Sequence, residues 1–233
     1  MKEFMVTKTK SEFLKRDQSH LVHPLHSPTA HDSARIWVSG EGAYLIDNEG
    51  KRFIDCLSGL WNNTAGNGRK ELSEAAAHQM TELGYASGYA GSSNPRAIEL
   101  AERLATLTYP NINHFYLTSG GGESTDSNIK LARYYWKLKG KEEKVKVISR
   151  IWGYHGVTLG AMCATGISSY WKMFEPRMDG FSHIPSPYPY FYETPSGSKS
   201  QGIAAADELE KKILEEGPGT VAMFLAEPVQ GAG

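Results

Sequence analysis

The chain has 233 residues, of which 40% are hydrophobic and 22% are charged, values that are ordinary for a globular protein. At roughly 100–200 residues per domain, this length predicts one large domain or two smaller ones. Lys and Arg number 25 against 26 Asp and Glu, which gives a net charge of −1. This balance argues against a nucleic-acid-binding protein and against binding to an acidic membrane surface.

Neither a membrane span nor an export signal is expected. The longest apolar runs, such as residues 221–226, are far too short to cross a bilayer, and the first residues lack the apolar core of a signal peptide. The two cysteines, Cys56 and Cys163, stand in no metal-ligand spacing, so no metal site is predicted. A reduced, cytoplasmic setting is therefore expected.

The first part of the chain predicts a small antiparallel sheet. Residues 1–34 are polar, and their apolar residues do not recur at a regular spacing. We interpret them as a short helix and an extended arm. Short strands are predicted over residues 35–38, 43–47 and 52–57. The Asp-Asn-Glu-Gly sequence at residues 47–50 predicts a hairpin turn, because Asn and Gly tolerate positive φ.

The remainder of the chain alternates between helices and strands. Helices are predicted over residues 70–83, 95–108, 124–139 and 203–216, and strands over residues 114–117, 145–149 and 220–225. Gly84 is expected to cap the first helix, and Asn94-Pro95 to begin the second. The strands are continuously apolar, which predicts an α/β fold with a parallel sheet covered on both faces. Residues 185–200 form a long predicted loop, for which a functional role and a plain surface role are equally open.

The glycine-rich segment Ser119-Gly120-Gly121-Gly122 lies between a predicted strand and a predicted helix. Glycines let backbone N–H groups approach an anion closely, and a helix N-terminus favours negative charge, so phosphate is the natural ligand. The segment matches neither the Walker loop nor the dinucleotide fingerprint. These residues alone leave open a second interpretation, a turn that only lets strand and helix pack.

Two further features follow predicted strands. Tyr154 and His155, flanked by glycines, come after the strand at 145–149, and Glu227 comes after the strand at 220–225. Ligands bind at the carboxyl ends of parallel strands, where an aromatic ring between glycines can stack on a planar group. Taken singly, the tyrosine and the histidine also fit a structural role, and the glutamate fits a solvated surface. Together, a phosphate cradle, a stacking ring and a carboxylate predict a planar, phosphorylated cofactor.

Four segments in the same order resemble the class III pyridoxal-phosphate aminotransferases, especially the ω-amine:pyruvate branch. They are residues 40–69, 116–136, 146–162 and 226–233. The resemblance implies fold type I, with a mostly parallel sheet in a large domain and a small α+β domain. It places the N-terminal arm and part of the small domain in residues 1–69, and the first part of the large, cofactor-binding domain in residues 70–233.

The resemblance also implies roles for particular residues. The cofactor would be pyridoxal 5'-phosphate, with Tyr154 stacked on its ring and the backbone N–H groups of Gly121 and Gly122 on its phosphate. Many members of the family have Ser where Gly122 stands, so that a hydroxyl contact would be lost here. The remaining cofactor contacts would come from Ser119, Gly120, His155 and Glu227, and the substrate pocket would include Leu60, Trp61 and Tyr89.

In the family, the lysine that forms the Schiff base and the aspartate that pairs with the pyridine nitrogen both follow the Glu-Pro motif. We therefore expect both beyond Gly233 and assign no catalytic residue within this sequence, which we interpret as the N-terminal half of an enzyme. The reaction implied is transfer of an amino group from a primary amine or ω-amino acid to a keto acid such as pyruvate, in a homodimer with shared active sites. An aminomutase, racemase or lyase, or a non-catalytic fragment, remains an alternative.

Overall fold

The computed structural model describes residues 9–24, 29, 32–89, 91–195, 197 and 200–233. The chain divides into two compact units, Met1–Thr106 and Leu107–Gly233, and each is described by itself. The division expected at residues 69 and 70 concerns the domains of a complete enzyme, and it stays a prediction.

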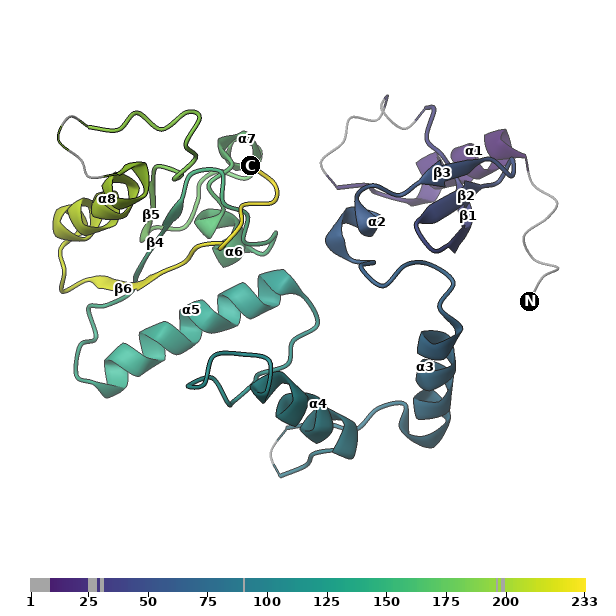
Figure 1. Ribbon diagram of the computed structural model, residues 1–233, viewed down its shortest axis with the longest axis horizontal. Coiled ribbons are helices and arrows are strands. Elements are labelled where there is room, and N and C mark those ends of the chain that lie inside the picture. Colours follow the sequence, from purple (N-terminus) through teal and green to yellow (C-terminus); the bar gives the residue numbers. More distant parts are fainter. Residues whose placement is uncertain (1–8, 25–28, 30–31, 90, 196, 198–199) are drawn as a thin grey trace. The chain divides into compact units, whose positions relative to one another are not determined.

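The first unit contains the predicted antiparallel sheet, in the order β1-β2-β3 (Figure 1). Its strands are β1 (Trp37–Glu41), β2 (Tyr44–Asp47) and β3 (Arg52–Ile54). The buried Asp47 carboxylate closes the predicted turn by accepting from the N–H groups of Glu49 and Lys51, at 3.0 and 2.9 Å. Gly50 has a φ of 79°, as a turn at this point requires.

The helices of the first unit are α1 (Lys10–His20), α2 (Ser58–Trp61), α3 (Lys70–Leu83) and α4 (Pro95–Ala105). Thr9 and Glu12 form a capping box at α1, and Asn94 Oδ1 caps α4 by accepting from the Ala97 N–H at 3.0 Å. The α3 boundary is confirmed, with Gly84 at the C-cap position, where its backbone is right-handed at a φ of −69°. Neither α3 nor α4 has a buried residue in the part of the chain that the structure describes.

The second unit is built on a parallel sheet with the strand order β5-β4-β6. The strands are β4 (Lys146–Arg150), β5 (Phe181–Ile184) and β6 (Val221–Phe224), and the helices are α5 (Gly121–Leu138), α6 (Leu159–Ala164), α7 (Ser168–Trp171) and α8 (Gln201–Glu216). The central strand β4 is buried on both faces, because successive side chains point to opposite sides and helices cover both (Figure 1).

Helix α8 covers one face of the sheet, where Leu209 and Ile213 pack against Ile148 and its buried neighbours. On α5, the Trp136 Nε1–H donates to the Ala222 carbonyl of β6 at 2.7 Å. The Ser149 hydroxyl of β4 donates to the last carbonyl of α6 at 2.5 Å. The parallel, doubly covered sheet predicted from the apolar strands is thus confirmed.

Several predicted elements differ from the structure. Strand β1 begins at Trp37 instead of residue 35, and strand β3 ends at Ile54 instead of residue 57. Residues 114–117 form no strand, because no strand in the described part of the chain pairs with them, and Tyr116 and Leu117 are exposed. Helix α4 ends at Ala105 instead of residue 108, in a turn where the Thr106 N–H donates to the Arg103 carbonyl. Helix α5 begins at Gly121 instead of residue 124, so two of the predicted loop glycines belong to its first turn.

Strand β5 and helices α6 and α7 were not predicted. Strand β5 is only four residues long and includes a serine and a histidine, and α6 and α7 are four to six residues long. Such short elements carry too few periods for a hydrophobic pattern to identify them.

Candidate functional site

The first component of the site is the N-terminus of α5. Gly120 is the N-cap and supplies no side-chain hydrogen bond, and the helical bonding begins with the Ser124 N–H donating to the Gly120 carbonyl at 3.0 Å. The N–H groups of Gly121 and Gly122 therefore have no partner within the helix. Glu123 folds back so that its carboxylate accepts from the Ser119 N–H at 3.0 Å. The first turn thus presents backbone donors that the helix itself does not bond, together with the positive end of the helix dipole.

A backbone contact joins this helix start to the segment that carries Tyr154. Gly156 has a φ of 129°, and a Cβ built there would lie 2.6 Å from the Gly122 Cα and 3.0 Å from the Ala161 Cβ. Only a glycine fits between these two backbones. The distance between the α5 N-terminus and the Tyr154 segment is therefore set by direct backbone packing.

Hydrogen bonds from both sides fix His155 beside Tyr154. The Thr125 hydroxyl of α5 donates to the His155 carbonyl at 2.7 Å, and the His155 N–H donates to the Thr165 hydroxyl at 2.9 Å. Thr165 is 1% exposed, and its hydroxyl also donates to the Ala161 carbonyl at 3.0 Å. The backbone of this segment is consequently held in place, while the Tyr154 side chain remains 38% exposed and open to a ligand.

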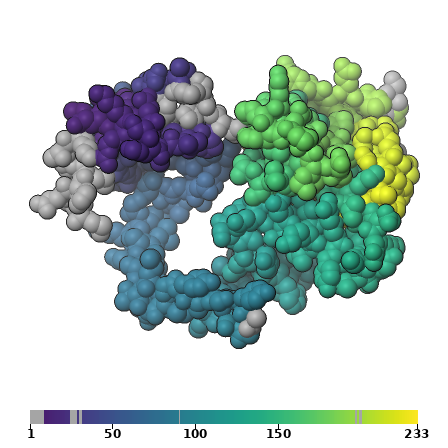
Figure 2. Space-filling view, turned by 180° about the vertical axis from the view of Figure 1, so that it is seen from behind, coloured from purple at the N-terminus to yellow at the C-terminus, as the bar shows by residue number. Residues whose placement is uncertain are grey.

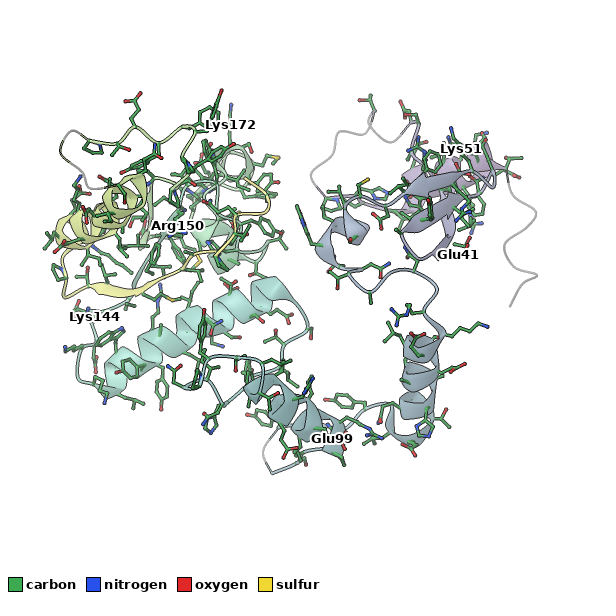
Figure 3. The ribbon with its side chains drawn as sticks, viewed as in Figure 1. Glu41, Lys51, Glu99, Lys144, Arg150 and Lys172 are labelled. Atoms are coloured by element: carbon green, nitrogen blue, oxygen red, sulfur yellow. The ribbon has the colours of Figure 1, made fainter. Side chains whose placement is uncertain are left out.

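The Glu227 side chain fastens the same segment from the neighbouring strand. One carboxylate oxygen, Oε2, accepts from the Tyr154 N–H at 2.8 Å, and the other accepts from the Gly231 N–H at 3.4 Å. Arg150, labelled in Figure 3 at the end of β4, donates from Nη1 to the Glu227 carbonyl at 3.3 Å. In Figure 2 the last residues of the chain, in yellow, lie at the surface of the second unit. Glu227 thus links two strand ends, and the alternative interpretation of it as a solvated surface residue does not account for these contacts.

The His155 ring is buried and its Nε2 atom has no hydrogen-bond partner among the described residues. Burial lowers the pKa of His155, because desolvation disfavours the charged imidazolium, while the nearby Glu227 carboxylate raises it in part. A second histidine, His183 on β5, also has a pKa lowered chiefly by burial, and its ring packs at 5.0 Å from Trp171. Both rings are therefore neutral at pH 7.

An aromatic cluster lies at the same end of β4. The ring of Trp152 contacts those of Tyr188 and Phe191 edge-on, with centroids 6.1 and 5.9 Å apart. These rings border a hollow of about 230 Å³ that also includes Ile151. The predicted loop at residues 185–200 is thus packed in part against the segment that carries Tyr154.

The three predicted substrate-pocket residues lie in the first unit. Leu60 and Trp61 belong to α2, whose backbone is left-handed, with φ of 63° and 62°, and Ser58 shares this conformation at 49°. Each such residue costs roughly 1–2 kcal/mol. The Trp61 N–H donates to the Leu57 carbonyl at 2.8 Å, one of the bonds that maintain the turn. The side chains of Leu60, Trp61 and Tyr89 are 61, 57 and 85% exposed.

Among the described residues, no helix is long and apolar enough to cross a membrane, and no group of three or more His, Cys, Asp or Glu side chains is arranged to hold a metal ion. The site features that the sequence did not point out are the hydroxyls of Thr125, Thr158 and Thr165 and the Arg150 guanidinium. Three of these four lie inside the segments that carry the resemblance, but only contacts across the fold distinguish them from their neighbours.

Comparison with known proteins decides the family. The profile of the family "Aminotransferase class-III" matches residues 27–233. This chain belongs to the class-III aminotransferases. It is 38% identical over 200 residues to a putrescine–pyruvate aminotransferase of Pseudomonas aeruginosa, covering 86% of this chain and 44% of that protein.

Solved structures agree with this assignment. An (S)-enantioselective ω-transaminase from Thermomicrobium roseum superimposes with a TM-score of 0.91 at 43% identity, over 97% of this chain and 51% of that one. The PMP-bound form of an aminotransferase from Vibrio fluvialis gives a TM-score of 0.88 at 31% identity, over 97% of this chain and 50% of that one. The chain thus has the fold of these PLP-dependent transaminases, and spans about half the length of the relatives that it matches.

The residues of the second unit fit pyridoxal 5'-phosphate, the cofactor of this family. The N–H groups at the start of α5, which have no partner within the helix, suit a phosphate, and the half-exposed Tyr154 ring suits a planar ring. The Gly122–Gly156 contact brings the backbones of these two features together. The buried Nε2 of His155, which has no hydrogen-bond partner in the described part of the chain, adds a polar atom that a ligand could bond.

Proposed function

We propose that the intact protein carrying this sequence is a PLP-dependent transaminase, which transfers an amino group from a primary amine or ω-amino acid to a keto acid such as pyruvate. The observation that carries the proposal is the backbone contact between Gly122 and Gly156, which joins a phosphate-binding helix start to a ring-stacking segment. The family match over residues 27–233 supports it. The bound cofactor supplies the electron-withdrawing ring on which amino-group transfer depends.

Each site residue has a proposed part. The N–H groups of Gly121 and Gly122, with Ser119 and Gly120 beside them, bind the phosphate at the positive end of α5. Tyr154 stacks on the cofactor ring. This arrangement anchors the cofactor at both ends, so that its reactive atom is held in one orientation.

Glu227 and His155 lie next to that ring. Glu227 orients the Tyr154 backbone through its 2.8 Å hydrogen bond. His155, neutral at pH 7, completes the polar surroundings of the ring without adding a positive charge. In the first unit, Leu60, Trp61 and Tyr89 are proposed to form an apolar, partly aromatic wall of the amine pocket.

The assembly and location are also proposals. We infer a homodimer with active sites shared between subunits, an arm and part of a small domain in residues 1–69, and the start of the large domain in residues 70–233. We propose a cytoplasmic location, which fits the two cysteines, Cys56 and Cys163, because their spacing is not typical of disulfides.

The experiment supplies the intact protein with PLP, an amine donor and pyruvate, and measures alanine by chromatography. We expect alanine formation that depends on both the amine and the cofactor. Tyr154→Ala should lower the affinity for PLP, whereas Tyr154→Phe, which keeps the ring, should retain it. Conversion of the amine without consumption of pyruvate would instead indicate an aminomutase, racemase or lyase, and absence of both PLP binding and amine conversion would overturn the proposal.

A further inference from the structure

Helix α2 is a left-handed turn built mostly from residues that disfavour this conformation. Its four residues, Ser58–Trp61, have φ of 49°, 61°, 63° and 62° in chain order. A left-handed backbone brings the Cβ of an L-residue too close to the following carbonyl oxygen, so glycine adopts it far more readily than serine, leucine or tryptophan. Burial does not offset this strain within the described part of the chain, because the side chains of Leu60 and Trp61 are largely exposed. Other contacts must therefore hold the turn.

Two polar side chains bond the backbone of the turn. Asp55 Oδ2 accepts from the Gly59 N–H at 2.9 Å. The Asn62 side-chain amide donates from Nδ2 to the carbonyls of Gly59 and Leu60, at 3.4 and 3.1 Å. One acceptor and one donor group thus satisfy backbone groups that so short a turn does not pair by itself.

Both ends of the turn are attached to the small sheet of the first unit. Before the turn, the Asp55 N–H donates to the Ala43 carbonyl at 2.8 Å. After it, the Asn63 side chain donates to Asn67 Oδ1 at 2.7 Å, and the Asn67 N–H donates to the Gly42 carbonyl at 2.8 Å. Gly42 and Ala43 connect β1 to β2. The turn therefore has a fixed base, and the directions of its side chains depend on the bonds within it.

We propose that Asp55 and Asn62 are positioning residues for the amine substrate, because they hold the left-handed turn that aims Leu60 and Trp61. The inference rests on the proposed function, since it takes these two side chains as a wall of the amine pocket. A change of the turn to the right-handed conformation would reverse the sign of φ, so that its side chains would leave the backbone in different directions. Strained backbone of this kind persists only where surrounding contacts enforce it, and it is concentrated at ligand-binding positions.

Isosteric variants separate these hydrogen bonds from general damage. Asn62→Asp keeps the shape of the side chain but replaces the donor by an acceptor that faces two carbonyls, so the turn should relax. Asp55→Asn keeps an oxygen that can accept from the Gly59 N–H and should be tolerated, whereas Asp55→Ala removes it. Asn111→Asp, at an exposed position of the second unit, is the matched control for the change in residue type and charge.

The experiment supplies the intact protein with PLP and pyruvate and measures kcat/KM for two amines. Benzylamine presents a ring to an apolar wall, whereas ethylamine is too small to fill the same space. We expect Asn62→Asp and Asp55→Ala to lower kcat/KM for benzylamine about 10-fold relative to ethylamine. Asp55→Asn and Asn111→Asp should leave this ratio within about 2-fold of the unmodified protein. A ratio that Asn62→Asp leaves unchanged, with both amines affected equally, would indicate a merely structural role and overturn the inference.

A second measurement follows the Trp61 ring directly. The tryptophans are isotope-labelled, and the NMR signal of the Trp61 indole N–H is assigned by its loss in Trp61→Phe. This signal should move in Asn62→Asp and keep its position in Asp55→Asn and Asn111→Asp. An unmoved signal in Asn62→Asp would overturn the inference while leaving the proposed function intact. Failure of the unmodified protein to form alanine from any amine would instead overturn the proposed function, and the indole signal would still test the turn.

Discussion

Replacing Gly156 by alanine tests the contact on which the site depends. The new Cβ would lie 2.6 Å from the Gly122 Cα and 3.0 Å from the Ala161 Cβ, so one backbone must move. Overpacking of this kind costs about 1–3 kcal/mol. The φ of 129° disfavours any residue with a Cβ and adds roughly 1–2 kcal/mol. Gly156→Ala should therefore lower the free energy of unfolding by about 2–5 kcal/mol.

The same displacement should separate the phosphate donors from the Tyr154 ring. We expect a weaker affinity for pyridoxamine 5'-phosphate, measured by calorimetry beside urea denaturation of the cofactor-free protein. Gly140→Ala, at the other end of α5, is the matched control, because Gly140 has a φ of 68° and a Cβ there would meet nothing within 4 Å. In Gly140→Ala only the backbone strain of the positive φ remains, so the free energy of unfolding should fall by roughly 1–2 kcal/mol. The cofactor affinity should be unchanged. Equal losses in the two variants would refute the steric argument.

Three further changes test neighbouring contacts. Glu227→Ala removes the acceptor of the Tyr154 N–H and should weaken cofactor binding about 10-fold by calorimetry, and Glu227→Gln, whose amide oxygen can accept the same bond, should restore most of it. Burial lowers the pKa of His155 below its unfolded value of 6.5, so its neutral form contributes stability that is present above pH 6.5 and lost as the pH falls through the folded pKa. Urea denaturation between pH 7.5 and 5 should show this loss. Trp136→Phe removes the 2.7 Å hydrogen bond to the Ala222 carbonyl. It should lower the free energy of unfolding, measured by urea denaturation, by about 1 kcal/mol.

Each of these has a control. Glu210→Gln, on an exposed position of α8, should leave cofactor affinity unchanged, and an equal effect there would point to net charge instead of the Glu227 contact. His155→Gln should flatten the decline in stability with falling pH; an unchanged slope would assign it to other groups. Trp37→Phe, on the small sheet, should change stability by less than about 0.5 kcal/mol, and a loss as large as that of Trp136→Phe would contradict the hydrogen-bond account.

The hydrophobic pattern alone predicted the larger elements of the second unit. Helix α5, helix α8 and strands β4 and β6 are long or continuously apolar, so their periods are readable without tertiary context. The same holds for the hairpin turn at residues 47–50, whose residue types define its backbone. The strand expected at residues 114–117 failed for the opposite reason. Its apolar residues favour an extended chain, but a strand also needs a neighbour, and none pairs with it in the described part of the chain.

Residue types and their order in the sequence determined the kind of ligand: glycines before a helix for phosphate, an aromatic ring between glycines for a planar group, and a carboxylate at a strand end. Tertiary structure alone decided how these features act together. Gly122 and Gly156, which are in contact, lie 34 positions apart in the sequence. The bonded pair Tyr154 and Glu227 is separated by an even longer stretch of chain, so no local pattern could reveal either contact. The partner of the Thr158 hydroxyl, 36 residues away, was equally hidden. Local sequence specifies the donors and the rings, whereas the parallel sheet brings its strand ends together and thereby sets the distances between them.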